Sequence, residues 1–224
     1  MLRYFAIIAL LVSSSCNGQP MARFGKPTNS PDRPAAKTNA PRSQFLKSPG
    51  GRPDPRYRQP RNLAELQAVA GEVAKSTGRK IHWNLALGKN PGPLVRISGD
   101  LANCAISIHP VAARQVPPNT WAFLFGHEFA HLTENLGPPS QTTPAKELKA
   151  DIAGARYAMA AGYRLESFLG WVLTQPNQSS STHGPLRLRV QAIATHFGIP
   201  QTTIQEQARR YSTQQTPRGS APSR

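Results

Sequence analysis

Cysteine is scarce in this chain of 224 residues and occurs only as Cys16 and Cys104. Because Cys16 lies beside a stretch that we expect to be an export signal, Cys104 has no partner in the rest of the chain. A framework of disulfides, on which many small secreted domains depend, is therefore excluded. Long apolar runs are also lacking, and beyond residues 4–12 no segment is apolar enough to cross a membrane.

Acidic residues are few as well, with 11 against 27 Lys and Arg, which gives a formal net charge of +16. Residues 19–61 hold ten of these basic residues, two Asp and few large apolar side chains. Such a segment cannot bury enough surface to offset the entropy lost on ordering, so we expect a disordered basic linker here and a disordered tail over residues 213–224. The alternative is contact of the linker with anionic lipid, cell-wall polymer or nucleic acid. Aromatic residues are scarce among the basic ones, which argues against a nucleic-acid-binding protein.

The first 18 residues have the features of a signal peptide. Arg3 supplies positive charge, residues 4–12 are apolar, and Ser13 to Ser15 form a small-residue cleavage zone. The apolar run is shorter than the roughly 20 residues that a membrane-spanning helix needs. Cys16 stands where a bacterial lipoprotein carries its acylated cysteine, so lipidation of Cys16 and plain secretory cleavage near Ser15 are both open. Both alternatives predict an exported protein, periplasmic or secreted. Lipidation of Cys16 would in addition attach it to a bacterial membrane.

Residues 62–212 have the composition of one folded domain. Apolar residues at helical spacing predict a first helix that Gly78 ends, and three short apolar stretches predict strands. Four helices are expected next, with a last one near the end of the domain. The expected strands are 81–87, 94–97 and 104–109, and the expected helices are 120–136, 144–161, 165–174, 185–197 and 204–211. The predicted fold class is α+β, with a small sheet of about three strands before a helical half.

An H-E-x-x-H motif lies in the first of these four helices. His127 and His131 are four residues apart, so both imidazoles project from one face and can bind one metal ion. Glu128 is turned one position away from that face, where it can reach a metal-bound water without being a ligand. Asn119 is the expected cap of this helix, and Gly137 its expected end. The alternative is that the motif occurs here by chance. A third metal ligand elsewhere in the chain would favour the metal site over chance.

The helix predicted over 144–161 offers the third ligand. Glu147 lies in its first turn, after Thr143 as the cap, and a catalytic zinc usually takes three protein ligands. Asp151 shares a face with Glu147 and can accept the free N–H of a ligand histidine, which fixes the orientation of the ring. Gly154 indicates a close approach of two backbones. Glu134 is a competing carboxylate, but it lies a turn beyond the histidines.

Three segments together resemble the HtpX-like gluzincin metallopeptidases: H-E-F-A-H at 127–131, E-L-K-A-D at 147–151, and S-T-H-G-P at 181–185 followed by Arg189. The resemblance covers roughly residues 62–198 and implies a zincin-like minimal metallopeptidase domain with one zinc ion. It also implies that a strand before the metal helix, at residues 105–109, pairs with the substrate backbone. Two features depart from the family: Gly184 replaces a proline, and the membrane-spanning helices of many relatives are missing.

The predicted function is hydrolysis of peptide bonds in proteins of the bacterial cell envelope. Glu128 would be the general base, and His183 would donate a hydrogen bond to the oxyanion, unless it is merely a residue at a helix start beside Pro185. Arg189 is expected to pair with a carboxylate near the site. The partner would be a protein or peptide substrate, with no nucleic acid. The alternative function is a zinc-stabilised envelope chaperone or adaptor that binds without cutting, for which Glu128 would have no use.

Overall fold

The computed structural model describes residue 60 and residues 62–88, 94–136, 142–177, 179–180 and 183–215. The predicted signal peptide with Cys16, the basic linker apart from Pro60, and the predicted helix end at Gly137 all lie outside the described residues. So does the expected tail, except for residues 213–215, which belong to the last helix.

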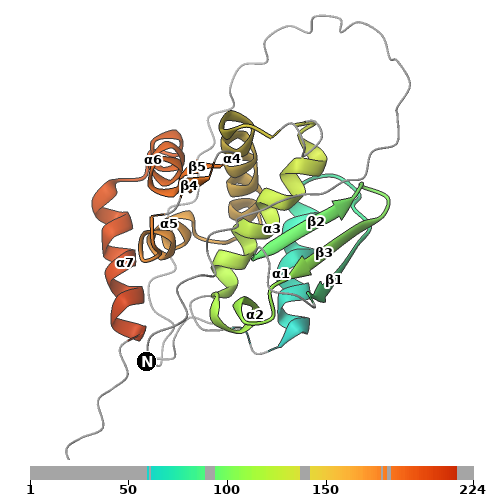
Figure 1. The fold of residues 1–224 in the computed structure, drawn as a ribbon, viewed down its shortest axis with the longest axis horizontal. Coiled ribbons are helices and arrows are strands. Elements are labelled where there is room, and N and C mark those ends of the chain that lie inside the picture. The colour runs from blue at the N-terminus through green and yellow to red at the C-terminus, as the bar shows by residue number, and fades with distance from the viewer. Residues whose placement is uncertain are drawn as a thin grey trace, which may run out of the picture.

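The fold is α+β, as predicted, with a small mixed sheet and a mostly helical remainder (Figure 1). The elements are α1 (Leu63–Ser76), β1 (Trp83–Leu87), β2 (Val95–Gly99), β3 (Cys104–Ile108), α2 (Ala112–Gln115), α3 (Pro118–Thr133), α4 (Pro144–Ala160), α5 (Leu165–Leu173), β4 (Ser179–Ser180), β5 (Gly184–Pro185), α6 (Leu186–His196) and α7 (Gln201–Gln215). The short helix α2 and the two-residue strands β4 and β5 were not expected. None of the described helices combines the length and apolarity needed to cross a bilayer.

The three-stranded sheet has the order β1-β3-β2, so β3 is its central strand. β1 runs parallel to β3, with Leu85 opposite Ile106, and β2 runs antiparallel to it, with Ile97 also opposite Ile106. These three side chains are buried and alternate with more exposed residues, as expected of a sheet with one covered face. Because both edges of β3 are paired, the prediction that residues 105–109 pair with a substrate backbone is wrong. In the described part of the sheet, β2 and β1 are the edge strands.

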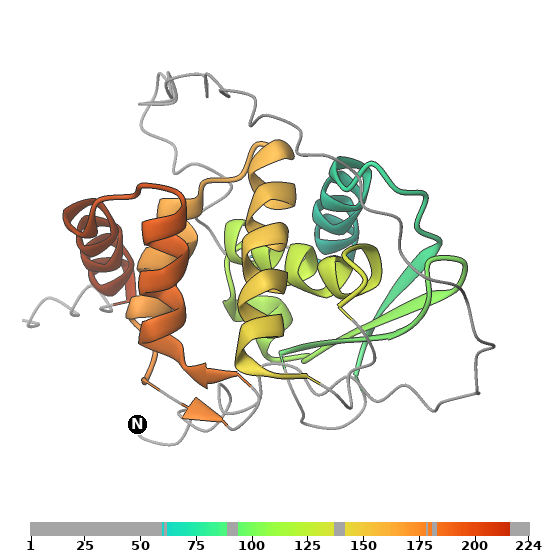
Figure 2. The same cartoon turned by 90° about the horizontal axis from the view of Figure 1, so that it is seen from above.

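The motif helix α3 lies at the centre of the molecule. Every residue from Pro118 to Ala130 is buried, which is typical of a helix surrounded by other elements. Trp121 and Phe125 are fully buried and stack with ring centroids 5.4 Å apart. Figure 2 shows α3 crossing between α1 and α4, with the sheet at one end of the molecule and α6 and α7 at the other. The chemistry carried by α3 is therefore enclosed by elements from both halves of the domain.

One predicted helix cap, at Thr143, is present, one, at Asn119, is wrong, and a cap that was not predicted is present at Asn62. The Oδ1 atom of Asn62 accepts from the Glu65 N–H at 3.0 Å, and Thr143 Oγ1 accepts from the Lys146 N–H at 3.3 Å. Asn119 does not cap α3, because the helix already begins at Pro118 and Pro117 holds the cap position. Instead, the Asn119 side chain donates to the Arg164 carbonyl at 3.0 Å and accepts from the Arg164 N–H at 2.9 Å. It thereby fastens the start of α3 to the start of α5.

Candidate metal centre

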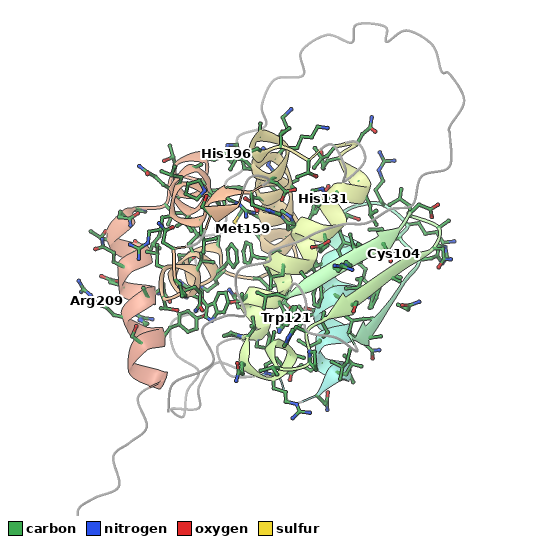
Figure 3. The ribbon with its side chains drawn as sticks, in the orientation of Figure 1. Cys104, Trp121, His131, Met159, His196 and Arg209 are labelled. Carbon is green, nitrogen blue, oxygen red and sulfur yellow. The ribbon has the colours of Figure 1, made fainter. Side chains whose placement is uncertain are left out.

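The two motif histidines meet on the face of α3 that is turned toward α4. The Nε2 atoms of His127 and His131 lie 3.1 Å apart, and their rings are nearly perpendicular, at 77°. Figure 3 labels His131 on α3, beside the α4 ribbon. Two nitrogen lone pairs that converge at this distance are arranged to bind one shared cation.

Helix α4 brings the predicted third ligand to the same point. Glu147 Oε2 lies 3.2 Å from His127 Nε2, and Oε1 lies 3.6 Å from His131 Nε2. The Glu147 side chain is 1% exposed. Burial of a carboxylate is costly unless a positive charge or a metal compensates it. His127, His131 and Glu147 can therefore hold a metal ion, and their ligand atoms all lie within 4.8 Å of one another.

The spacing of these atoms can be tested against the geometry of a metal ion. Nitrogen and oxygen ligands bind zinc at about 2.0–2.1 Å in a tetrahedral arrangement, which places neighbouring ligand atoms about 3.3 Å apart. The two histidine Nε2 atoms are 3.1 Å apart, Glu147 Oε2 is 3.2 Å from His127 Nε2, and the other oxygen of Glu147, Oε1, is 3.6 Å from His131 Nε2. Two imidazoles and one carboxylate thus fit an ion of this size in both distance and chemistry.

A close crossing of two glycines sets the distance between α3 and α4. A Cβ added to Gly126 would lie 2.4 Å from the Gly154 carbonyl oxygen, and a Cβ added to Gly154 would lie 2.4 Å from the His127 nitrogen. Both are far below ordinary van der Waals contact. The close backbone approach predicted at Gly154 is confirmed, and Gly126 is its counterpart on α3. Without this crossing Glu147 could not reach the two histidines.

Asp151 and Arg189 form a chain of contacts behind His127. Asp151 Oδ1 accepts from His127 Nδ1 at 2.9 Å, and this leaves Nε2 directed at the metal position. Arg189, on α6, donates to both oxygens of Asp151, through Nε at 2.8 Å and a terminal nitrogen at 2.6 Å. The carboxylate expected to pair with Arg189 is thus Asp151. Such supporting contacts orient a metal ligand and strengthen its basicity.

The pKa values of the ligands reflect this crowding of charge. Burial lowers the pKa of His127, but its hydrogen bonds to Asp151 and Glu147 outweigh burial and raise the pKa to about 10. Burial and the neighbouring His127 lower the pKa of His131 to about 4. Burial raises the pKa of Asp151, but the charge of Arg189 and the bond to His127 hold it well below its usual range. At neutral pH the metal-free ligands therefore carry one titratable proton, on His127.

Glu128 lies beside the triad in a different environment. Its side chain is fully buried, and burial raises its pKa to about 8, although His127 and the backbone of Ile97 favour the charged form. Among the described residues, neither carboxylate oxygen makes a hydrogen bond of ordinary geometry. Native structures rarely leave both oxygens of a buried carboxyl group unsatisfied. This arrangement calls for a ligand, a water or a reacting group at the site.

His183 also reaches the centre. Its Nε2 atom lies 3.2 Å from Glu147 Oε2, the side chain is buried, and it precedes the start of α6 by three residues. Burial is the main cause that lowers its pKa. Gly184 has φ of +66°, a conformation closed to proline, whose ring fixes φ near −65°. The glycine at position 184 therefore has a conformational reason.

The other candidate residues lie elsewhere. Glu134 is exposed and accepts from the Tyr157 hydroxyl, so it is not a ligand. His109 Nδ1 accepts from the Val111 N–H at 3.2 Å in front of α2. His196 Nε2 contacts Arg156 at 3.2 Å on the surface. Both histidines therefore make structural contacts away from the metal position.

Sequence reasoning missed an apolar pocket that opens beside His127 and Glu128. Residues from β2, α3, α5 and α6 line it, and Phe123 stacks on Phe168 with centroids 4.6 Å apart. A cluster of aromatic residues in the segment that forms α5 was the one available signal, but it is equally typical of core.

Comparisons with models of protein families, with curated proteins and with solved structures found no match for this chain. What it does must therefore be argued from the centre itself.

Proposed function

We propose that this protein is a zinc-dependent endopeptidase with a zincin-like catalytic domain. The signal peptide expected from the sequence would direct it to proteins of the bacterial cell envelope. Two imidazoles and one carboxylate form a donor set that suits zinc and leaves a fourth position open, as catalytic zinc sites do.

The observation that carries the proposal is the state of Glu128. Its carboxylate is fully buried next to the metal triad, and among the described residues neither of its oxygens makes a hydrogen bond of ordinary geometry. A metal site with a purely structural role gains nothing from this burial, which is costly. A general base, in contrast, has to be held close to the metal and out of bulk water.

Each residue then has a distinct task. When bound at His127, His131 and Glu147, zinc would polarise the scissile carbonyl and acidify a water molecule. Glu128 would take the proton of that water on a carboxylate oxygen and pass it to the departing amine. His183, whose Nε2 lies at the edge of the centre, would donate to the negative charge that develops on the carbonyl oxygen.

Among the described residues, the outer edge of β2 pairs with no other strand, which supports a peptide as the substrate. Leu94 accepts a hydrogen bond from the His109 N–H at 2.9 Å, so the alternation of an antiparallel pair turns the backbone groups of Val95 and Ile97 away from β3. Leu94 and Val95 also line the pocket beside Glu128. An extended substrate chain can add to this edge by backbone hydrogen bonds, as peptides do at other exposed edges.

The test is cleavage of a mixed peptide library by the full chain, with bound zinc measured on the same samples. We expect cleavage that disappears in a chelated sample and in Glu128→Gln, although Glu128→Gln still binds zinc. Glu206→Gln makes the same change on an exposed carboxylate of α7 and should leave cleavage unchanged. Zinc binding without cleavage would favour the non-cutting chaperone or adaptor, and absence of both would refute the proposal.

A further inference from the structure

A second cavity lies on the face of α6 next to the one that lines the apolar pocket. It is a groove of about 910 Å³ between α6 and α7, at the end of the molecule away from the sheet (Figure 2). Leu173 of α5 and Ile199, in the connection between α6 and α7, also line it, and Val190 contributes to both cavities. Pockets that hold small ligands enclose about 300–1,000 Å³, so the groove has room for a short peptide segment.

Each of the two helices presents a polar face to this groove. Side chains four residues apart lie on the same face of a helix. The lining contains three such residues from each helix: Arg187, Gln191 and Thr195 of α6, and Gln201, Gln205 and Arg209 of α7. All six residues are exposed, so an occupant can reach them without any rearrangement of the core.

The charge of the groove has one sign. Arg187 and Arg209 are the charged residues of its lining, and among the described residues no carboxylate belongs to that lining. Glu206, on α7, is exposed but lies outside it. A cleft of one charge attracts ligands of the opposite charge, and the planar guanidinium of arginine can bind a carboxylate through two hydrogen bonds. The groove is therefore complementary to an occupant that carries carboxylates.

The neutral polar residues of the groove favour a peptide over a lipid. The side-chain amides of Gln191 and Gln205 each offer a carbonyl acceptor and an NH₂ donor, which match the N–H and C=O groups of a peptide backbone. An acyl chain would cover these amides without giving them partners, which is costly. The rest of this chain supplies no acidic segment, because residues 1–61 hold two Asp against eleven Lys and Arg, and residues 216–224 hold no acidic residue. The occupant therefore comes from another protein.

We propose that this groove binds an acidic peptide segment of another protein. Arg187 and Arg209 pair with its carboxylates, and Gln191 and Gln205 bond to its backbone. A segment bound here lies beside the cavity next to Glu128 without entering it, because the two cavities share Val190. This inference goes beyond the proposed peptidase function and does not depend on it, since no group of the metal centre takes part in the binding.

The first test measures binding of a fluorescein-labelled peptide, in which Glu alternates with Ala, by fluorescence anisotropy. The full-length Glu128→Gln protein is used, so that cleavage of the peptide cannot interfere. Exposed charge pairs contribute about 2- to 5-fold each, so Arg187→Gln combined with Arg209→Gln should weaken binding about 4- to 25-fold. The matched control, Arg56→Gln combined with Arg58→Gln, removes the same charge from the basic segment 19–61 and should leave the affinity nearly unchanged. Equal losses in the two double variants would overturn the proposal, because net charge alone would then explain the binding.

A second test separates the peptide from other occupants. A neutral peptide with Gln in place of Glu should bind more weakly than the acidic one, and Gln191→Ala combined with Gln205→Ala should weaken the binding of both. Equal affinity for the two peptides, or no effect of the glutamine variant, would overturn the proposal. Binding to phosphatidylglycerol vesicles that requires both arginines, without binding of the peptide, would assign the groove to a lipid surface and overturn it as well. None of these results depends on whether the chain cleaves peptides.

Discussion

Replacement of Gly154 by alanine should weaken metal binding although residue 154 is not a ligand. The added Cβ would lie 2.4 Å from the His127 nitrogen, 2.6 Å from the Gly126 carbonyl carbon and 2.8 Å from the His127 Cα. All three atoms are backbone, so no side chain can turn aside. Because ordinary contact begins near 3.4 Å, α3 and α4 have to separate by roughly 1 Å.

The magnitude follows from the opposing effects. Overpacking of this kind costs about 1–3 kcal/mol, while alanine in place of glycine returns up to about 1 kcal/mol of helix propensity. The fold should therefore survive. Metal ligands, however, tolerate displacements of only about 0.2 Å, so binding zinc would force the strained crossing to re-form. A strain of about 1–3 kcal/mol corresponds to a loss of zinc affinity of about 5- to 150-fold.

Gly170→Ala is the matched control. A Cβ there would lie 2.3 Å from Gln207 Cβ and 2.9 Å from the Ala208 nitrogen, at the crossing of α5 and α7 rather than at the metal centre. Zinc affinity is measured by competition with a chelating dye, and stability by urea unfolding of the metal-free proteins. Gly170→Ala should lose stability but keep its zinc affinity. If Gly154→Ala binds zinc as tightly as the unchanged protein, the argument that the crossing positions Glu147 is refuted.

Three further predictions address protons, the contacts behind the metal, and packing. The pKa of His127 is raised to about 10 and that of His131 lowered to about 4, so at pH 6 the metal-free ligands hold one titratable proton, on His127. Glu128, whose pKa burial raises to about 8, holds a second proton at that pH. In Glu128→Gln, where only the His127 proton remains to be displaced, zinc affinity should rise about tenfold per pH unit, and calorimetry in two buffers should detect the release of about one proton, not of none or of two. Asp151→Asn should lower zinc affinity about 10- to 100-fold in dye competition, because it weakens the support of His127. Asn119→Ala should destabilise the fold by about 1–3 kcal/mol in urea unfolding, because the Arg164 backbone loses both partners, while zinc affinity stays unchanged.

Local signals in the sequence located most of the helices. Thr143 was predicted as a cap because a short polar side chain before an apolar periodic stretch satisfies the first free N–H groups of a helix. Asn62 caps α1 in the same way, although it was not predicted. The helix at Pro144–Ala160 accordingly lies within one residue of its predicted range, 144–161. Nothing outside the segment itself is needed for these predictions.

The order of the strands was not predictable in the same way. Short apolar stretches predicted three strands, but which strand lies in the middle depends on how the sheet packs against helices distant in sequence. The central position of β3 therefore came only from the structure, and it moved the expected substrate edge to β2. Asn119 failed as a cap for a related reason, because its partner Arg164 lies 45 residues away.

The candidate site combines features that local sequence predicts with features that depend on tertiary packing. The four-residue spacing of His127 and His131 fixes their shared helix face, whereas the position of Glu147 depends on a tertiary crossing in which one glycine lies immediately before the motif. On α6, Arg189 supports Asp151 behind the metal, and the next residue, Val190, lines the apolar pocket. Any shift of α6 therefore moves both the support of His127 and the wall of the pocket. Zinc affinity and cleavage preference should consequently both be measured for substitutions that reshape this wall. A change in both quantities indicates that α6 has moved, whereas a change in cleavage preference alone indicates an effect confined to the pocket.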